Sequence, residues 1–230
     1  KEFGQGALAL TDHGNLYGAV DFYKTAKKAG IKPILGCELY LTPGSRHDKR
    51  AKIDDIRYHL PLLVKNETGW KNLIQLVTKA HLEGFYYKPR VDKELLREYH
   101  EGLICLSGCF SGEIPKLFHQ GKRAEARQVM EFYREIFGED FYIEIQPHNE
   151  PELREALIAF AREHSLPLVA TCDAHYVRKE DKTAHEVLLA VQTGAKIDDE
   201  KRFSMAEFEA HLRSPEEMEE EFQDVPEALE

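Results

Sequence analysis

The stretch Ala7–Asn15 reads ALALTDHGN and contains the pattern on which the fold prediction rests. Four apolar residues, typical of a short buried strand, are followed at once by Thr, Asp and His. Similar short apolar segments recur along the chain, and most of them contain or end in polar residues that can bind metal. The strands predicted in this way are Ala7–Leu10, Pro33–Leu41, His59–Val64, Leu103–Ser107, Phe141–Gln146 and Leu168–Thr171.

Longer segments with a helical period separate these strands. Repeated alternation of strand and helix predicts an α/β fold with a parallel sheet and helices packed outside it. The strands are almost continuously apolar, which is typical of strands that are buried on both faces. The predicted helices are Leu16–Ala29, Trp70–Leu82, Asp92–Tyr99, Glu113–His119, Arg123–Phe137, Glu152–His164 and Glu180–Thr193.

Metal-competent side chains lie in or next to most of the predicted strands. In a β/α barrel the C-terminal strand ends converge on one face, so residues far apart in sequence would meet there. Imidazole and thiolate suit Zn²⁺, whereas carboxylates can bridge two ions or accept Mn²⁺. A centre with two or more ions favours hydrolysis of a phosphate ester. The candidate ligands are His13, Glu38, His59, Cys109, Asp173 and His175.

Each candidate also has a simpler interpretation. A single His near a strand end is more often a structural hydrogen-bonding residue, and Asp12 or Asp173 could cap the helix that follows it. Glu38 lies inside an apolar run, where a buried carboxylate needs a partner. Six such residues in succession favour a shared role. The remaining histidines fall on predicted helices or loops, and we assign them no role: His47, His81, His100, His119, His164, His185 and His211.

The charge of the chain is unevenly distributed. The 230 residues carry a formal net charge of −10, which by itself argues against nucleic acid as a partner. Residues 198–230, however, hold 13 acidic and 3 basic side chains, so residues 1–197 are neutral. The acidic run after Ser214-Pro215 predicts a solvated helix. We expect residues 1–197 to form the barrel and residues 198–230 to complete the domain or to lead into a further part of the protein.

Composition bounds the cellular setting. The chain has no apolar run of roughly 20 residues, so no membrane is expected as a partner. Its four cysteines include no CxxC pair, and reduced thiols in a cytoplasmic protein are the simplest interpretation.

Six blocks of the sequence stand out together: ALALTDHGNLYGAVDFYKTAKKAGIKPILGCELY, YHLPLLVKNETGWKNL, EGFYYKPRVDKELL, EGLICLSGCFSGEIP, YIEIQPHN and VATCDAHYVRKEDKTAHEVLLAVQTG. They resemble the polymerase and histidinol phosphatase (PHP) domain family, in the branch found in bacterial DNA polymerase III alpha subunits. The segments YKPRVDKELL and HYVRKEDKTAHEVLLA favour the polymerase branch over the histidinol phosphatases. In that branch residues 198–230 would complete the domain or lead into a polymerase body.

The resemblance implies a distorted seven-stranded (β/α) barrel with a three-metal centre. All six candidate ligands match family ligand positions, with Cys109 where many relatives have His. The resemblance also assigns Asp12 to orienting a ligand and places His148 near the site, and we assign both to catalysis. Two or three divalent ions are implied, with Zn preferred to Mn or Mg. The family's first HxH motif has no match in this chain, so we expect its first strand to be missing.

The implied activity is metal-dependent 3′–5′ exonuclease proofreading at the primer 3′ end of DNA. Four basic residues are candidates to hold the DNA backbone, with plain surface charge as the simpler interpretation: Lys88, Arg90, Arg178 and Lys179. Two alternatives stay open. The domain could be a non-catalytic scaffold that binds a separate proofreading exonuclease subunit and stabilises the polymerase, or it could be a pyrophosphatase or small-molecule phosphatase.

Overall fold

The computed structural model describes residues 2–230 and contains a seven-stranded sheet. Six strands lie where the sequence predicts them, within one residue at each end. The seventh, β4, has only two residues and is too short to carry a periodic pattern. The strands are β1 (Ala7–Leu10), β2 (Lys32–Leu41), β3 (Tyr58–Val64), β4 (Arg90–Val91), β5 (Leu103–Leu106), β6 (Phe141–Ile145) and β7 (Leu168–Ala170).

The sheet is mixed, so the prediction of a parallel sheet was wrong. Its order is β1-β2-β3-β5-β6-β7, and β4 pairs with β2. The strand β3 runs antiparallel to both β2 and β5, whereas the other pairs are parallel. The physical reason lies in residues 42–57, which connect β2 to β3 without a helix. A parallel return requires a crossover connection, usually a helix, so the chain instead turns back beside β2.

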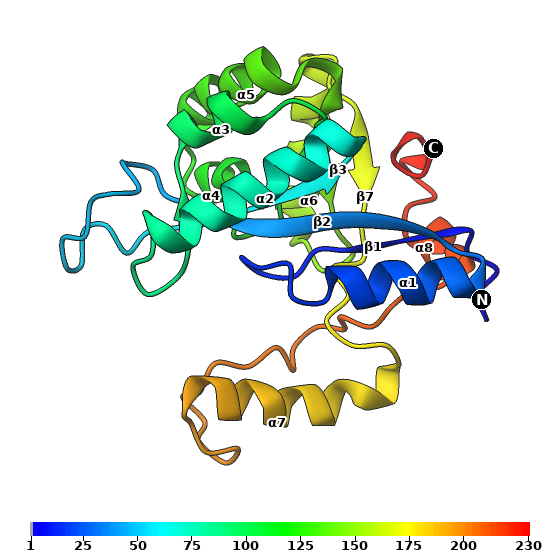
Figure 1. Ribbon diagram of the computed structural model, residues 1–230. Helices are drawn as coiled ribbons and strands as arrows, with labels where there is room; N and C mark the ends of the chain where they lie inside the picture. The colour runs from blue at the N-terminus through cyan, green and yellow to red at the C-terminus, as the bar shows by residue number, and fades with distance from the viewer. Residues whose placement is uncertain (1) are drawn as a thin grey trace.

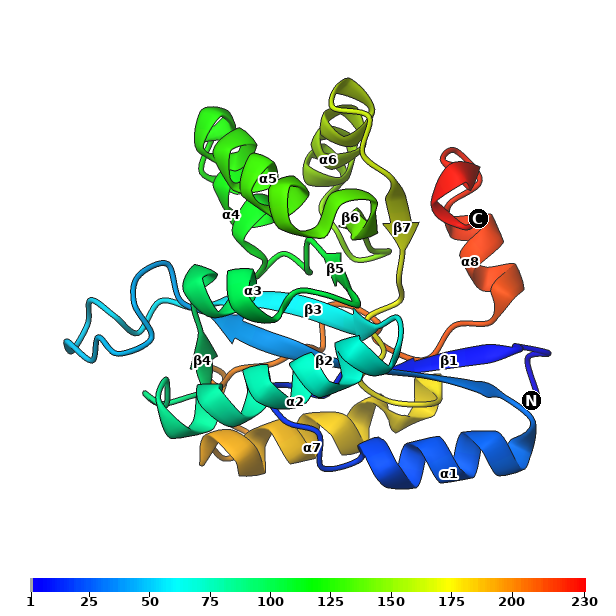
Figure 2. The ribbon, with the colours of Figure 1, turned by 45° about the horizontal axis from the view of Figure 1, so that its top comes forward.

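The sheet curls into a half-barrel whose outer strands in the pairing order are β1 and β7 (Figures 1 and 2). The helices α4, α5 and α6 gather on one side of the molecule, and α7 lies on the opposite side (Figures 1 and 2). The α-helices are α1 (Ala19–Ala29), α2 (Glu67–Leu82), α3 (Lys93–Tyr99), α4 (Glu113–His119), α5 (Arg123–Phe137), α6 (Pro151–Glu163), α7 (Lys182–Thr193) and α8 (Pro215–Glu221).

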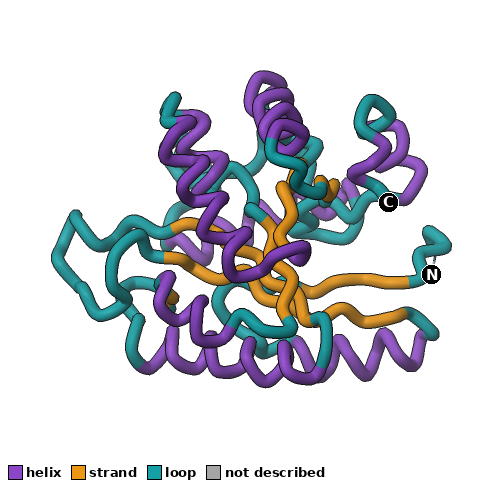
Figure 3. Tube along the Cα trace, turned by 90° about the horizontal axis from the view of Figure 1, so that it is seen from above, coloured by secondary structure: helices purple, strands orange, loops and turns teal. Residues whose placement is uncertain are grey.

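The local sequence explains the helix ends. The helix α1 stops at Gly30, whose left-handed backbone (φ 74°) lets its N–H reach the carbonyls of the last turn. Asn66 and Asp92 accept hydrogen bonds from the first turns of α2 and α3. Between the strands run long helices and loops, which Figure 3 shows wrapped around the sheet. These caps fix where α1 ends and where α2 and α3 begin.

The acidic C-terminal segment packs on the main core. Ser214 accepts a hydrogen bond from Glu217 N–H, and the Glu217 carboxylate accepts one from Ser214 N–H, so α8 begins where the sequence predicts it. Beyond α8, Phe222 and Val225 are fully buried in the cluster formed by β2, β3, β5 and β6 and their helices. The acidic side chains therefore belong to a segment that apolar contacts hold on the main core.

Candidate metal centre

His13, Glu38 and His59 form a compact group that could hold a metal ion. One ligand atom from each residue lies within 4.8 Å of the others. His13 Nδ1 lies 3.5 Å from Glu38 Oε2, and His59 Nδ1 contacts Glu38 Oε1. The Glu38 side chain is 9% exposed, so the sequence argument that a buried carboxylate needs partners applies to it. Its partners are the two imidazoles.

Backbone pairing places these three side chains together. The loop after β1 stays paired with β2, because Glu38 N–H donates to Asp12 O (3.1 Å) and Gly14 N–H donates to Glu38 O (2.9 Å). His59 lies at the start of β3, opposite Tyr40. Because β3 is antiparallel to β2, the beginning of β3 lies beside the end of β2. The reversal that contradicted the parallel sheet is thus what brings His59 to the site.

Cys109 extends the group from the loop after β5. Its Sγ lies 3.7 Å from His59 Nδ1, and Ser111 N–H donates to it at 3.4 Å. Burial raises the pKa of the Cys109 thiol, and the Glu38 and Asp173 carboxylates raise it further. A cation nearby would reverse this effect, because it stabilises the thiolate. Gly108 permits the turn, since it has φ 84° and a Cβ there would lie 2.5 Å from the His59 carbonyl oxygen.

A second set of side chains meets the first from the loop after β7. Asp173 Oδ1 lies 3.4 Å from His175 Nε2, and Asp173 Oδ2 lies 3.7 Å from His148 Nε2. The His175 ring lies 5.9 Å from the His13 ring, which joins the two sets. Asp173 has a left-handed backbone (φ 45°), a strained conformation that is concentrated at functional sites.

The titration behaviour of this second set follows from its burial and contacts. Burial acts to raise the pKa of Asp173, but the hydrogen bond from His175 and the nearby imidazoles outweigh it, and the pKa is lowered. The hydrogen bond to Asp173 raises the pKa of His175. Burial lowers the pKa of His13 and of His148. Asp173 is therefore an anion at neutral pH, as a metal ligand must be.

A pocket of about 700 Å³ inside the half-barrel is lined by five of these side chains, namely His13, Glu38, Cys109, Asp173 and His175. Glu144 and Gln146 of the β6 end also line it, and the sequence interpretation missed them. Glu144 is 4% exposed in the apolar run FYIEI, so the argument applied to Glu38 would have found it. Among the described residues, Glu144 Oε2, Gln146 Oε1 and both His148 ring nitrogens are buried without a hydrogen-bond partner. Such orphaned atoms, next to a mixed N, O and S donor set, fit a bound cation.

Two further sequence interpretations change at this site. Asp12 lines the pocket, but its side chain does not cap α1, whose N-cap residue is Gly18. His185, assigned no role, has its ring 5.5 Å from that of His175. It lies on α7, where the sequence offered no strand-end pattern to mark it.

The four basic candidates for holding DNA have different surroundings. Lys88 Nζ lies 5.7 Å from the centre of the Tyr40 ring, at the edge of the metal centre. Arg178 and Lys179 are exposed and follow His175 closely, and Lys179 forms an ion pair with Glu217 at 3.2 Å.

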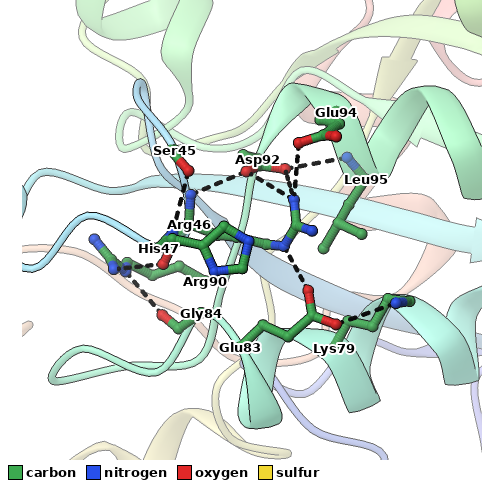
Figure 4. Close-up of polar contacts among 10 residues, drawn as sticks. All are labelled: Ser45, Arg46, His47, Lys79, Glu83, Gly84, Arg90, Asp92, Glu94 and Leu95. Atoms are coloured by element: carbon green, nitrogen blue, oxygen red, sulfur yellow. Dashed lines mark hydrogen bonds and ion pairs between the residues drawn. The ribbon is translucent and has the colours of Figure 1, made fainter.

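Arg90 cannot contact DNA, so that prediction was wrong. The residue is fully buried. Its guanidinium donates to the carbonyls of Gly84 (3.0 Å), Asp54 (2.6 Å), Arg46 (3.0 Å) and Asp48 (2.8 Å). Figure 4 shows this arginine beside Arg46, which bridges Glu83 and Asp92. The role of Arg90 is to hold the backbone of residues 46–54 and of Gly84.

None of the helices in residues 2–230 is long and apolar enough to cross a membrane. All four cysteines in the sequence are free thiols.

Comparison with known proteins gives one family match and a set of similar chains. The PHP domain family matches residues 1–148. The chain is 48% identical over 227 residues to the DNA polymerase III subunit alpha of Borreliella burgdorferi, covering 97% of this chain and 20% of that protein. It is 50% identical over 217 residues to the protein of the same name from Thermus aquaticus, covering 92% of this chain and 18% of that protein. The chain thus spans about a fifth of the length of these relatives.

Similarity to solved structures is weaker. An amidohydrolase from Chromobacterium violaceum aligns with a TM-score of 0.48 at 13% identity, covering 74% of this chain and 77% of that one. A putative metal-dependent phosphoesterase from Bifidobacterium adolescentis aligns with a TM-score of 0.42 at 14% identity, with the same coverage.

Proposed function

This chain belongs to the PHP domain family, and on that premise we propose that it is the metal-dependent 3′–5′ exonuclease domain of a bacterial DNA polymerase III alpha subunit. The reaction is hydrolysis of the terminal phosphodiester at a primer 3′ end. The observation that carries the proposal is the group formed by His13, Glu38 and His59, with Cys109 beside it. The names of the relatives in the two bacteria above support the polymerase assignment.

The donor set supports two or three divalent ions, with Zn preferred to Mn or Mg. Imidazole and thiolate donors come from His13, His59 and Cys109, and the carboxylate of Glu38 could bridge two ions. Bound ions would polarise a phosphate oxygen and lower the pKa of water. Asp173, His175 and His148 would complete the centre on the β7 side.

The chain's own residues determine how a substrate would approach. Glu38 and Cys109 are buried at the inner side of the group. The His13 side chain is 42% exposed, so the group is open on the side of the loop after β1. The phosphodiester would enter on that side. Asp12 fixes the position of Glu38 through its backbone carbonyl, which accepts the Glu38 N–H.

The test uses the purified protein, a 3′-labelled primer with a mismatched end, and added Zn²⁺ or Mn²⁺. Wild type is expected to shorten the primer and to contain two or three metal ions per chain. Asp173→Asn should reduce both the rate and the metal content, because it removes an anionic ligand. Asp140→Asn, which changes a carboxylate paired with Lys65, is the matched control and should leave both unchanged.

Two outcomes would contradict the proposal. Equal shortening by wild type and Asp173→Asn would point to a contaminating nuclease. Hydrolysis of a small phosphate ester or pyrophosphate with no shortening of the primer would indicate a small-molecule phosphatase or a pyrophosphatase instead.

An apolar surface on α7 supports a scaffold role as the second candidate. Val187, Leu188 and Val191 are 46%, 65% and 73% exposed. Exposed apolar patches often mark protein–protein contacts, and a polymerase body or a separate proofreading subunit would be the partner. Leu188→Ser should weaken co-purification of this chain with the separate proofreading subunit without changing the metal content of the chain. Unchanged co-purification would remove this candidate.

A further inference from the structure

We propose that the turn formed by residues 84–89 is a stacking platform for the unpaired terminal base of a single-stranded nucleic-acid end. Phe85 and Tyr87 would stack on the base, and Lys88 would bind the adjacent phosphate. The inference rests on the proposed function, because it specifies how that substrate is held. It adds a preference for nucleic-acid ends whose last base is not held in a base pair.

The turn lies next to the metal centre. It leads directly into β4, which pairs with the end of β2 so that Arg90 lies opposite Tyr40 (Figure 2). The Tyr40 ring lies 6.1 Å from the His13 ring and 5.5 Å from the His59 ring. Lys88 Nζ lies over the same Tyr40 ring, 5.7 Å from its centre. One aromatic ring therefore separates the lysine from two of the candidate ligands.

Hydrogen bonds and close packing hold the turn formed by residues 84–89 in place. Arg90 donates to the Gly84 carbonyl at 3.0 Å, and Tyr86 N–H donates to the Lys88 carbonyl at 3.0 Å. Gly14 packs so closely on the turn that a Cβ there would lie 2.9 Å from Pro89. The carbonyl of the same Gly14 contacts His81 Nε2 at 2.9 Å. The loop that carries His13 is thus fastened both to the turn and to α2.

Tyr87 is presented to solvent by a strained backbone. Its φ is 59°, the left-handed region that disfavours side chains with a Cβ, yet its side chain is 67% exposed. Phe85, two residues earlier, is 50% exposed. Burial therefore explains neither aromatic residue. Strain that persists at an exposed aromatic residue beside a candidate active site is the pattern expected of a binding element.

The chemistry selects an unpaired base with its phosphate. Aromatic faces stack on any base, and an ammonium group binds phosphate without reading sequence. A base inside a duplex has both faces covered by its neighbours, whereas a frayed or mismatched terminal base can swing out at little cost. The platform would thus favour mismatched ends before any hydrolysis takes place.

The test measures binding of two short single-stranded oligonucleotides to the full protein loaded with Zn²⁺. One ends in a normal 3′ base and the other in an abasic residue, and both carry a terminal phosphorothioate that slows hydrolysis. Wild type is expected to bind the first about 5- to 100-fold more tightly, which is the usual effect of one stacked base. Tyr87→Ala should lose this difference by weakening only the first complex. Tyr87→Phe should retain it.

Controls separate stacking from folding and from charge. Phe3→Ala changes an exposed aromatic residue and should retain the full difference. The N-terminus, next to this residue in sequence, lies far from β4 in Figure 2. Lys88→Ala should weaken both complexes equally, because both oligonucleotides have the phosphate. If Tyr87→Ala fails to fold, the fluorescence of a terminal 2-aminopurine gives a second test in wild type. Stacking on the platform should quench it, and unchanged fluorescence would overturn the proposal.

The result is distinguishable from failure of the proposed function. Primer shortening with no dependence on the terminal base, or Tyr87→Ala binding both oligonucleotides as wild type does, would overturn the platform and leave the exonuclease assignment intact. Base-dependent binding with no shortening would support the platform and contradict the exonuclease assignment.

Discussion

At the scale of single residues, the pocket contains two buried carboxylates with different surroundings. Glu38 lies between two imidazoles, whereas Glu144 accepts hydrogen bonds from the neutral groups of Gln146 and Thr171. Burial raises the pKa of Glu144 from its usual 4.5 to about 7, and the Asp173 and Glu38 charges act in the same direction. Glu144 is therefore poised to hold a proton near neutral pH, whereas the lowered pKa of Asp173 keeps that residue ionised.

This raised pKa predicts how the stability of the metal-free protein depends on pH. Below about pH 4 Glu144 is protonated in the folded and the unfolded chain alike. As pH rises, the unfolded chain ionises first, and the folded chain must then either keep its proton or bury a charge. Stability should fall by up to about 3 kcal/mol as pH rises from about 4.5 through about 7.

Glu144→Gln is expected to remove most of this fall. The measurement is urea unfolding of the EDTA-treated protein at several pH values between 5 and 8, compared between wild type and variant. Identical pH profiles for the two proteins would show that Glu144 does not carry the effect.

At the scale of elements, the loops that follow the strands position the site. The turn after β5 is a clear case, because Gly108 has φ 84° and lies against the His59 carbonyl. Gly108→Ala should shift either Cys109 or His59. We expect a loss of about 1–3 kcal/mol from steric overlap in addition to the strain of a left-handed alanine. Metal affinity should fall about 10-fold, as is usual when a ligand is displaced by its supporting residues.

Gly121→Ala provides the matched control for this substitution. Gly121 also has a left-handed backbone (φ 70°), but nothing lies within 4 Å of a Cβ added there. It should show the backbone strain alone, with unchanged metal affinity. Equal effects of the two substitutions on metal affinity, measured by competition with a chromogenic chelator, would contradict the packing argument.

The segment 42–57 depends on Arg90 for hydrogen bonds to its backbone. Arg90→Met would leave four carbonyl groups without their donor, and the expected cost is about 3 kcal/mol or more. Trypsin should then cleave within residues 46–57 much faster. Arg50→Met is the control, because Arg50 is 64% exposed and solvent screens its ion pair with Asp54. Comparable destabilisation by both would mean that burial of Arg90 is unimportant.

At the scale of the whole molecule, some features were predictable from sequence and others required the packed chain. The six strands were found because each has at least three consecutive apolar residues. The direction of β3 was missed, although the absence of a helical period in residues 42–57 could have indicated it. The burial of Arg90 could not be predicted, because the four carbonyls that it binds come from segments that meet only in the folded chain. Tyr87 likewise carries no periodic signal.

For the six candidate ligands, too, some features were predictable from sequence and others required the folded chain. The pattern of polar residues at strand ends correctly placed His13, Glu38, His59 and Cys109 in one region, and Asp173 with His175 beside it. Metal binding by this set stays a prediction. The pattern did not show that His148 pairs with Asp173 or that Glu144 lines the same pocket, since both depend on the curl of the sheet.

Anomalous X-ray scattering at the zinc edge, from crystals of the protein grown with Zn²⁺, tests the metal centre most directly. We predict one peak about 2.0–2.3 Å from ligand atoms of His13, Glu38 or His59, and a second beside Asp173 and His175. Crystals with zinc in the solvent but no anomalous peak inside the half-barrel, and with Glu38 contacting only its two histidines, would contradict the account.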